Sequence, residues 1–297
     1  MLMSGLLALS VALAAQVADG PASRPAGGHR VLQDVVFLPA GREERMDIYL
    51  PAGLRQGEVR PAVVVVHGGG WGHRRRREAV YIQACTKLAE SGYVAACIEY
   101  EIADRSKLGV NYLRNMAGAF PQNVQDVKSA VRFLRKNAAA YHIDGQHIAL
   151  MGASAGGHLA ALAAVTQPKD GLEPDDGHGD VSSAVQACIV YYGVFDFTTW
   201  GFKPATATDE DRAAAKRASP LQYVDKSDPP MLLLHGTKDR TVPYSQSEKM
   251  AARLKELGVA HELITMQGKD HGMFYRPDRS GLDDHAAVVK FLGHHLR

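Results

Sequence analysis

Two runs of the chain are apolar almost throughout: residues 62–66 read AVVVV, and residues 231–234 read MLLL. A strand buried on both faces of a parallel sheet has this composition, because neither face carries alternating polar residues. Helix-like patterns lie between such runs. In residues 123–140, apolar residues recur every three to four positions, with Lys and Arg between them. Repetition of strand and helix predicts an α/β fold, with a mostly parallel central sheet and helices on both faces.

The same patterns predict about eight strands and about five helices. We expect the strands at residues 31–38, 46–50, 62–67, 94–99, 147–151, 185–192, 231–235 and 261–266. We expect the helices at residues 77–90, 123–140, 155–165, 245–257 and 283–294. Because no helical pattern separates the first two strands, they should form an antiparallel hairpin. Two polar insertions interrupt the alternation at residues 167–183 and 200–219, and long insertions often serve as lids or surface excursions.

The charge balance excludes some partners. Lys and Arg together number 34 against 32 Asp and Glu, which gives a formal charge of +2. Nucleic acid and anionic membrane surfaces attract proteins with a marked excess of basic residues, so we expect neither as a partner. Beyond the N-terminus, no segment is long and apolar enough to predict an integral membrane span.

The N-terminus resembles a targeting segment. Residues 6–15 are apolar and end in small residues, so we expect residues 1–15 to be a signal peptide and the protein to be secreted or periplasmic. The absence of Lys and Arg from residues 1–5 leaves a plain apolar leader as the alternative. Residues 16–30 are expected to be a linker, and residues 31–297 one folded domain.

The three cysteines, Cys85, Cys97 and Cys188, fit neither a disulfide framework nor a zinc site. Cys97 and Cys188 lie in apolar runs and are interpreted as core residues. The sequence leaves a Cys85–Cys97 disulfide open. No metal-binding or nucleotide-binding motif is present, so we expect neither a metal nor a cofactor.

A Gly-x-Ser-x-Gly pentapeptide occupies residues 152–156, directly after an expected strand and at the start of an expected helix. A serine that presents its hydroxyl from a sharp strand-to-helix turn needs glycine two residues to either side, where backbones approach closely. The alternative is a glycine-rich helix start with serine in its first turn. The context favours Ser154 as a nucleophile.

Three glycines follow His67 at the end of an expected buried strand. Successive glycines allow a loop to turn several N–H groups toward one point, as the stabilisation of an oxyanion requires. We therefore expect the N–H groups of Gly69, Gly70 and Ala155 to form an oxyanion hole. A flexible glycine turn is the alternative.

A serine nucleophile needs a base, and the base needs a carboxylate that holds its tautomer. Asp239 and His271 follow two successive expected strands, in the chain order Ser, Asp, His. Asp196 is an alternative acid, whereas Asp270, which adjoins the histidine, is interpreted as a loop residue. His158 either supports the serine turn or caps nearby backbone.

Two charged segments have simple interpretations. Residues 74–77 (RRRR) suit a solvated loop better than an anion-binding site, although the latter stays open. Residues 175–180 (DDGHGD) lack the spacing of a calcium-binding loop and are interpreted as a turn.

Several motifs together resemble the α/β-hydrolase esterase/lipase family, and most closely its hormone-sensitive-lipase-like and bacterial feruloyl-esterase-domain branch. These motifs are HGGGW at 67–71, GASAGGH at 152–158, PPMLLLHGTKD at 229–239 and DHG at 270–272. Residues 120–126 and 180–186 are also similar to that branch, and the resemblance extends over about residues 33–296. One departure is Tyr100-Glu101, where relatives often have Tyr-Arg.

The resemblance implies an α/β-hydrolase catalytic domain at 31–297 with a Ser154–Asp239–His271 triad. It implies hydrolysis of short-chain carboxylic esters without a cofactor; an exported enzyme of this kind could deacylate plant polysaccharide. Trp71, Phe274 and Tyr275 either line the substrate pocket or pack beneath it. Two alternatives stay open: a serine peptidase or amidase on the same fold, and a hydrolase-fold binding protein without catalysis.

Overall fold

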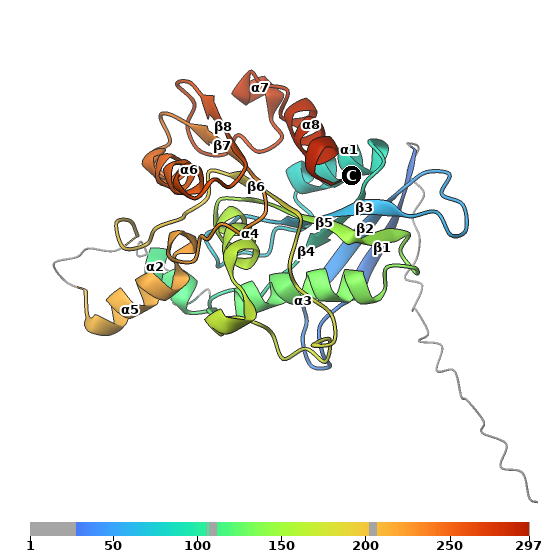
Figure 1. Ribbon diagram of the computed structural model, residues 1–297, viewed down its shortest axis with the longest axis horizontal. Coiled ribbons are helices and arrows are strands. Elements are labelled where there is room, and N and C mark those ends of the chain that lie inside the picture. Colours follow the sequence, from blue (N-terminus) through green and yellow to red (C-terminus); the bar gives the residue numbers. More distant parts are fainter. Residues whose placement is uncertain (1–27, 105, 107–111, 202–206, 297) are drawn as a thin grey trace, which may run out of the picture.

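The computed structural model of the chain describes residues 28–104, 106, 112–201 and 207–296. In this part of the chain, eight strands form one sheet in the order β1-β2-β4-β3-β5-β6-β7-β8 (Figure 1). The strands are β1 (His29–Val36), β2 (Arg45–Pro51), β3 (Arg60–Val66), β4 (Val94–Ile98), β5 (Ile143–Ala153), β6 (Ala187–Tyr191), β7 (Met231–Gly236) and β8 (His261–Met266). The expected number of strands is confirmed.

Strand direction also follows the prediction. β1 and β2 pair antiparallel as the expected hairpin, and β2 pairs antiparallel with β4. The remaining neighbours pair in parallel. One boundary is corrected, because His29 and Arg30 belong to β1 rather than to a linker. The expected signal peptide lies outside the described residues.

The main helices are α1 (Ala79–Glu90), α3 (Gln122–Lys136), α4 (Ala155–Val165), α6 (Ser245–Leu257) and α8 (Asp284–His295). They agree closely with the five expected helices. Three shorter helices, α2 (Tyr112–Ala117), α5 (Asp209–Ala218) and α7 (Pro277–Ser280), lie in loops. Helix α5 forms within the second insertion, where Thr208 accepts a hydrogen bond from the Asp211 N–H and so caps its first turn.

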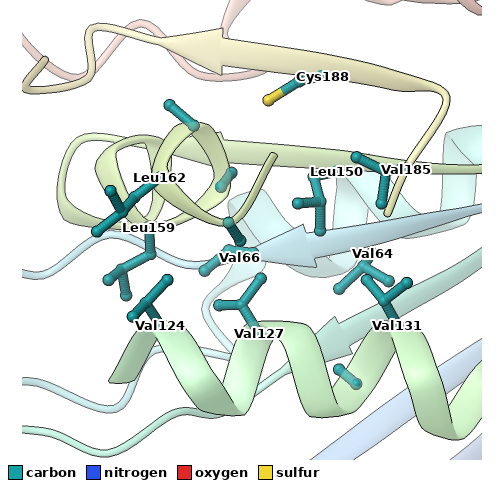
Figure 2. Close-up of a cluster of buried hydrophobic side chains, with 14 of the residues drawn as sticks. Val64, Val66, Val124, Val127, Val131, Leu150, Leu159, Leu162, Val185 and Cys188 are labelled. Atoms are coloured by element: carbon teal, nitrogen blue, oxygen red, sulfur yellow. The ribbon is translucent and has the colours of Figure 1, made fainter. Parts of the chain in front are cut away.

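The sheet is buried on both faces. Val64 and Val66 of β3 belong to one core cluster, together with Val124, Val127 and Val131 of α3 (Figure 2). Alternate residues of the same strand belong to a second cluster, which includes side chains of α1 and α8. Figure 1 shows α3 on one side of the sheet and α1 and α8 on the other. Two buried faces explain why β3 is apolar throughout.

The cysteines are core residues. Cys85, Cys97 and Cys188 are buried and free, so the structure contains no disulfide between Cys85 and Cys97. Burial raises the pKa of Cys188 above its usual range, which keeps this thiol protonated. Among the described residues, no helix has both the length and the apolar character that crossing a bilayer requires.

Candidate active site

Ser154 lies at the turn between β5 and α4, with φ of +56° and ψ of −120°. Such a backbone is strained for a residue with a side chain and marks functional turns. Neighbouring glycines permit it: a Cβ atom on Gly156 would lie 2.2 Å from the carbonyl oxygen of Val66, and one on Gly152 would lie 2.3 Å from that of Gly156. The structure therefore provides the close backbone approach that the pentapeptide predicts.

His271 connects the serine to a carboxylate. Its Nε2 lies 3.0 Å from Ser154 Oγ, and its Nδ1 lies 2.7 Å from Asp239 Oδ2. Asp239 follows β7 and His271 follows β8, so parallel neighbours bring both loops to the carboxyl edge of the sheet. The three side chains that the sequence singles out thus come together in one hydrogen-bonded chain.

Asp239 is held in place from several sides. Its Oδ1 accepts hydrogen bonds from the N–H groups of Thr241 and Val242, at 2.9 and 2.8 Å. Burial opposes ionisation, but contacts with His235 and His271 outweigh it and hold the pKa of Asp239 well below its usual range. The carboxylate is therefore charged at neutral pH and faces the His271 ring. His235 Nε2 lies 3.3 Å from Asp239 Oδ2. The sequence pattern did not single out this histidine.

The loop after β3 lies beside the serine. Gly69 and Gly70 have φ of +122° and +60°, values that glycine adopts most easily. The N–H of Gly68 donates to Tyr81 Oη at 2.7 Å, so it is not free to bind another acceptor. The N–H groups of Gly69, Gly70 and Ala155 make no hydrogen bond to any residue that the structure describes. Stabilisation of an oxyanion requires free N–H donors of this kind.

Trp71 and His158 hold this loop against α4. The Trp71 indole N–H donates to His158 Nδ1 at 3.1 Å, and His158 Nε2 donates to the Ala218 carbonyl at 2.7 Å. An indole can only donate, so this pair fixes His158 as the neutral tautomer with its hydrogen on Nε2. Burial agrees, because it lowers the pKa of His158 to about 4. Of the two roles left open for His158, it supports the turn by anchoring Trp71 and also contacts nearby backbone.

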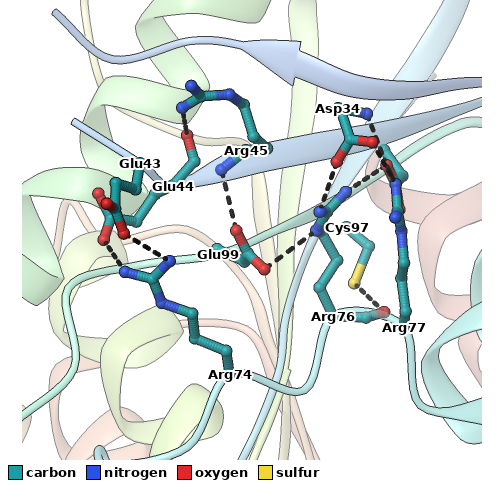
Figure 3. A network of polar contacts seen from close by, with 10 residues as sticks. Asp34, Glu43, Glu44, Arg45, Arg74, Arg76, Arg77, Cys97 and Glu99 are labelled. Atoms are coloured by element: carbon teal, nitrogen blue, oxygen red, sulfur yellow. Dashed lines mark hydrogen bonds and ion pairs between the residues drawn. The ribbon is translucent and has the colours of Figure 1, made fainter. Parts of the chain in front are cut away.

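The arginine run is a loop whose Arg74 and Arg77 are exposed, as predicted, but Arg76 is buried, which the prediction of a solvated loop did not include. Arg76 is 6% exposed and binds Asp47, which is 2% exposed. Figure 3 shows Arg76 and Arg77 paired with Asp34. Arg74 binds Glu44 at 2.8 Å, and Arg77 binds Asp47 at 3.0 Å. These pairs attach the segment after the glycine loop to β2 and to Glu44, which directly precedes that strand. These ion pairs could not be predicted from the local pattern, because the carboxylates come from distant positions in the chain.

The other candidate carboxylates, Asp196 and Asp270, form ion pairs with other residues. Asp196 binds Lys249 at 2.9 Å and accepts hydrogen bonds from neighbouring threonines. Asp270 pairs with Arg240 at 2.6 Å, as suits a loop residue. In the 175–180 segment, Asp180 pairs with Lys136 at 3.0 Å. No cluster of potential metal ligands occurs among the described residues.

A cavity of about 430 Å³ opens above Ser154 and His271. Phe274 contributes to its wall, whereas Trp71 and Tyr275 do not line it and are each 2% exposed. Of the two roles left open for these aromatic residues, packing fits Trp71 and Tyr275. Tyr81 and Tyr192, which the sequence analysis did not single out, also line the cavity.

The sheet order, the serine turn and the loops that carry Asp239 and His271 define an α/β-hydrolase fold. The chain belongs to the BD-FAE family, whose model matches residues 46–254. This membership agrees with the family resemblance of the sequence motifs.

Several named relatives are esterases. The chain is 33% identical over 239 residues to Esterase LipQ of Mycobacterium tuberculosis, covering 76% of this chain and 53% of LipQ. It thus spans about half the length of the curated relatives it matches first. Thermogutta terrifontis Est2 with bound propionate superposes with a TM-score of 0.74 at 27% identity, covering 94% of this chain and 95% of that one. A truncated carbohydrate esterase from gut microbiota gives a TM-score of 0.70 at 25% identity, covering 89% and 95% of the two chains.

Proposed function

We propose that the protein is a carboxylesterase, a serine hydrolase that cleaves short-chain acyl esters. One observation carries this proposal: the two hydrogen bonds of 3.0 and 2.7 Å that link Ser154, His271 and Asp239 beside a cavity. The esterase relatives support a reaction on esters rather than on peptides or amides.

In the first step, Ser154 Oγ attacks the carbonyl carbon of the ester while His271 Nε2 takes the hydroxyl proton. Asp239 keeps the opposite ring nitrogen protonated and stabilises the imidazolium that forms. His271 then gives its proton to the departing alcohol, which leaves an acyl group on Ser154. In the second step, His271 activates a water molecule, which attacks the acyl-enzyme and releases the acid.

The N–H groups of Gly69, Gly70 and Ala155 stabilise the negative oxygen of each tetrahedral intermediate. Their lack of partners among the described residues supports this role, because a free N–H binds the oxyanion without first breaking another bond. Such donors act strongly at a site where little water competes. Loss of one donor typically slows the reaction by about 10²–10³.

A cavity of about 430 Å³ suits a small acyl group better than a long lipid chain. Propionate in the Est2 structure supports the same size class. The carbohydrate esterase among the structural matches supports an alcohol part that belongs to a polysaccharide, such as an acetylated plant polymer.

We also propose that the apolar stretch at residues 6–15 directs export to the periplasm or the medium. An enzyme that deacylates polysaccharide meets its substrate there. N-terminal sequencing of the protein from its native host tests this, with a mature N-terminus near residue 16 expected.

Hydrolysis of p-nitrophenyl acetate by purified protein tests the activity itself. Ser154→Ala should lower kcat by several orders of magnitude, on the order of 10⁶ for the loss of a serine nucleophile. Ser227→Ala, at an exposed serine outside the cavity, is the matched control and should retain activity. Turnover by Ser154→Ala at the wild-type rate would contradict the proposal, and preferential cleavage of aminoacyl anilides would indicate a peptidase.

A further inference from the structure

Charged side chains form part of the cavity wall. The residues that line it include two arginines, Arg75 and Arg276, and one carboxylate, Glu78. Arg75 precedes α1, whereas Arg276 follows His271 by five positions, so separate segments supply the two cations. The cavity is otherwise lined largely by aromatic side chains and glycine backbone.

The cavity wall carries more positive than negative charge, because two guanidinium groups face one carboxylate. Arg75 Nη1 binds Glu78 Oε1 at 2.7 Å, which neutralises one positive charge. The half-buried Arg276 makes no side-chain hydrogen bond or ion pair within the described part of the chain. The wall therefore carries one uncompensated positive charge, apart from any charge on the cavity histidines.

Arg75 packs against the glycine loop at the cavity wall. Its Nε atom is buried and has no hydrogen-bond partner. A Cβ atom on Gly69 would lie 2.9 Å from this Nε, which places the guanidinium directly against the glycine loop. Because the Nε is enclosed while the Arg75 side chain as a whole is 39% exposed, the terminal nitrogens of the guanidinium are the donors that a bound molecule can reach.

Taken with the proposed esterase function, on which this inference rests, we propose that the enzyme prefers esters that carry a carboxylate, bound by Arg276 and Arg75. Guanidinium groups suit this ligand because their planar N–H donors match the two oxygens of a carboxylate. A partly enclosed cavity strengthens the attraction relative to open water. The carboxylate belongs either to the acyl part or to the alcohol part of the ester.

Two pairs of substrates separate these sources. Monomethyl adipate and the methyl ester of its monoamide differ in charge on the acyl side. 4-Acetoxybenzoate and 4-acetoxybenzamide differ in charge on the alcohol side. The measured quantity is the ratio of kcat/KM for the acid to that for the neutral amide. We expect a ratio of about ten in at least one pair, falling as salt is added.

Substitutions on the cavity wall should change this ratio in opposite directions. Arg276→Gln and Arg75→Gln should bring it toward one, whereas Glu78→Gln, which removes the competing carboxylate, should raise it. Arg279→Gln, at an exposed arginine of α7 outside the cavity, is the matched control and should leave the ratio unchanged. A general loss of activity cancels in the ratio.

Two results would overturn the proposal: wild-type ratios near one in both pairs, or a preference that persists in both arginine variants. Hydrolysis of p-nitrophenyl acetate by the wild type and its loss in Ser154→Ala report on the esterase function separately. The charge preference can therefore fail while the esterase function stands.

Discussion

The Trp71 indole N–H donates a hydrogen bond of 3.1 Å to Nδ1 of His158, and this bond ties the glycine loop to the helix that begins after Ser154. Both partners are fully enclosed, with Trp71 at 2% exposure and His158 at 0%. The pair links the two segments that carry the proposed oxyanion donors, because Trp71 directly follows Gly69 and Gly70, and His158 follows Ala155 by three positions. The relative position of those donors should depend on it.

Trp71→Phe removes the donor and leaves His158 Nδ1 buried without a partner. We expect the free energy of unfolding to fall by about 1–3 kcal/mol. We also expect kcat for p-nitrophenyl acetate to fall about tenfold or more, since misplaced donors stabilise the transition state less well. Urea unfolding and steady-state kinetics measure the two effects. Trp200→Phe is the stability control, and equal losses in both variants would count against the Trp71–His158 bond.

Two buried histidines should make stability depend on pH. Burial lowers the pKa of His158 and of His67 to about 4. The unfolded chain, with ordinary histidine pKa values near 6.5, then binds more protons than the folded protein between about pH 6.5 and pH 4. The free energy of unfolding should therefore decrease as pH falls through this window, by up to about 3 kcal/mol per histidine.

Urea unfolding at pH 7 and pH 4.5 measures that decrease. His158→Gln should be less stable than the wild type at pH 7 but should lose less stability on acidification, because one of the two titrating groups is gone. Identical pH dependence in the two proteins would show that His158 does not contribute.

Asp239 and Asp270 provide a matched pair of carboxylates, because the account assigns Asp239 and not Asp270 as the partner of the His271 ring. Asp239→Asn keeps the shape but removes the charge that orients His271, so kcat should fall by about 10⁴. Asp270→Asn loses an exposed pair with Arg240 and should change kcat less than about threefold. Rate measurements on both variants, with circular dichroism as a check on folding, test the assignment. A larger loss in Asp270→Asn would reverse it.

Arg76 and Arg77 both bind Asp34 and Asp47. The two arginines differ in burial, because their side chains are 5% and 46% exposed. Arg76→Met leaves Asp47 with one fewer partner in a buried site and should lower the free energy of unfolding by about 3–5 kcal/mol. Arg77→Gln should cost at most about 1 kcal/mol. Chemical denaturation compares them, and similar losses would argue that burial does not decide the strength of these ion pairs.

The strands and main helices could be predicted because their signals are local. The AVVVV run of β3 and the valine spacing of α3 report burial directly, and the Gly-x-Ser-x-Gly turn reports a backbone constraint. Asp239 and His271 could be singled out because they follow β7 and β8, two strands that are consecutive in the chain and adjacent in the sheet. Helix α2 has only six residues, which is too short for a periodic pattern.

The remaining features depend on contacts between distant segments. Trp71 and Tyr275 could have been pocket or core residues, and only packing against other elements decides between them. The burial of Arg76 could not be predicted, because its partner Asp47 lies about thirty positions away in sequence. Tertiary structure overrides the local preference of a charged run for solvent when buried partners neutralise it.

The most direct test is a crystal structure of the protein after reaction with a fluorophosphonate. The account predicts one covalent adduct, on Ser154 Oγ, with a phosphonyl oxygen about 2.7–3.1 Å from the N–H groups of Gly69, Gly70 and Ala155. His271 should lie within hydrogen-bonding distance of the adduct. An adduct on another residue, or a phosphonyl oxygen that points away from these three N–H groups, would contradict it.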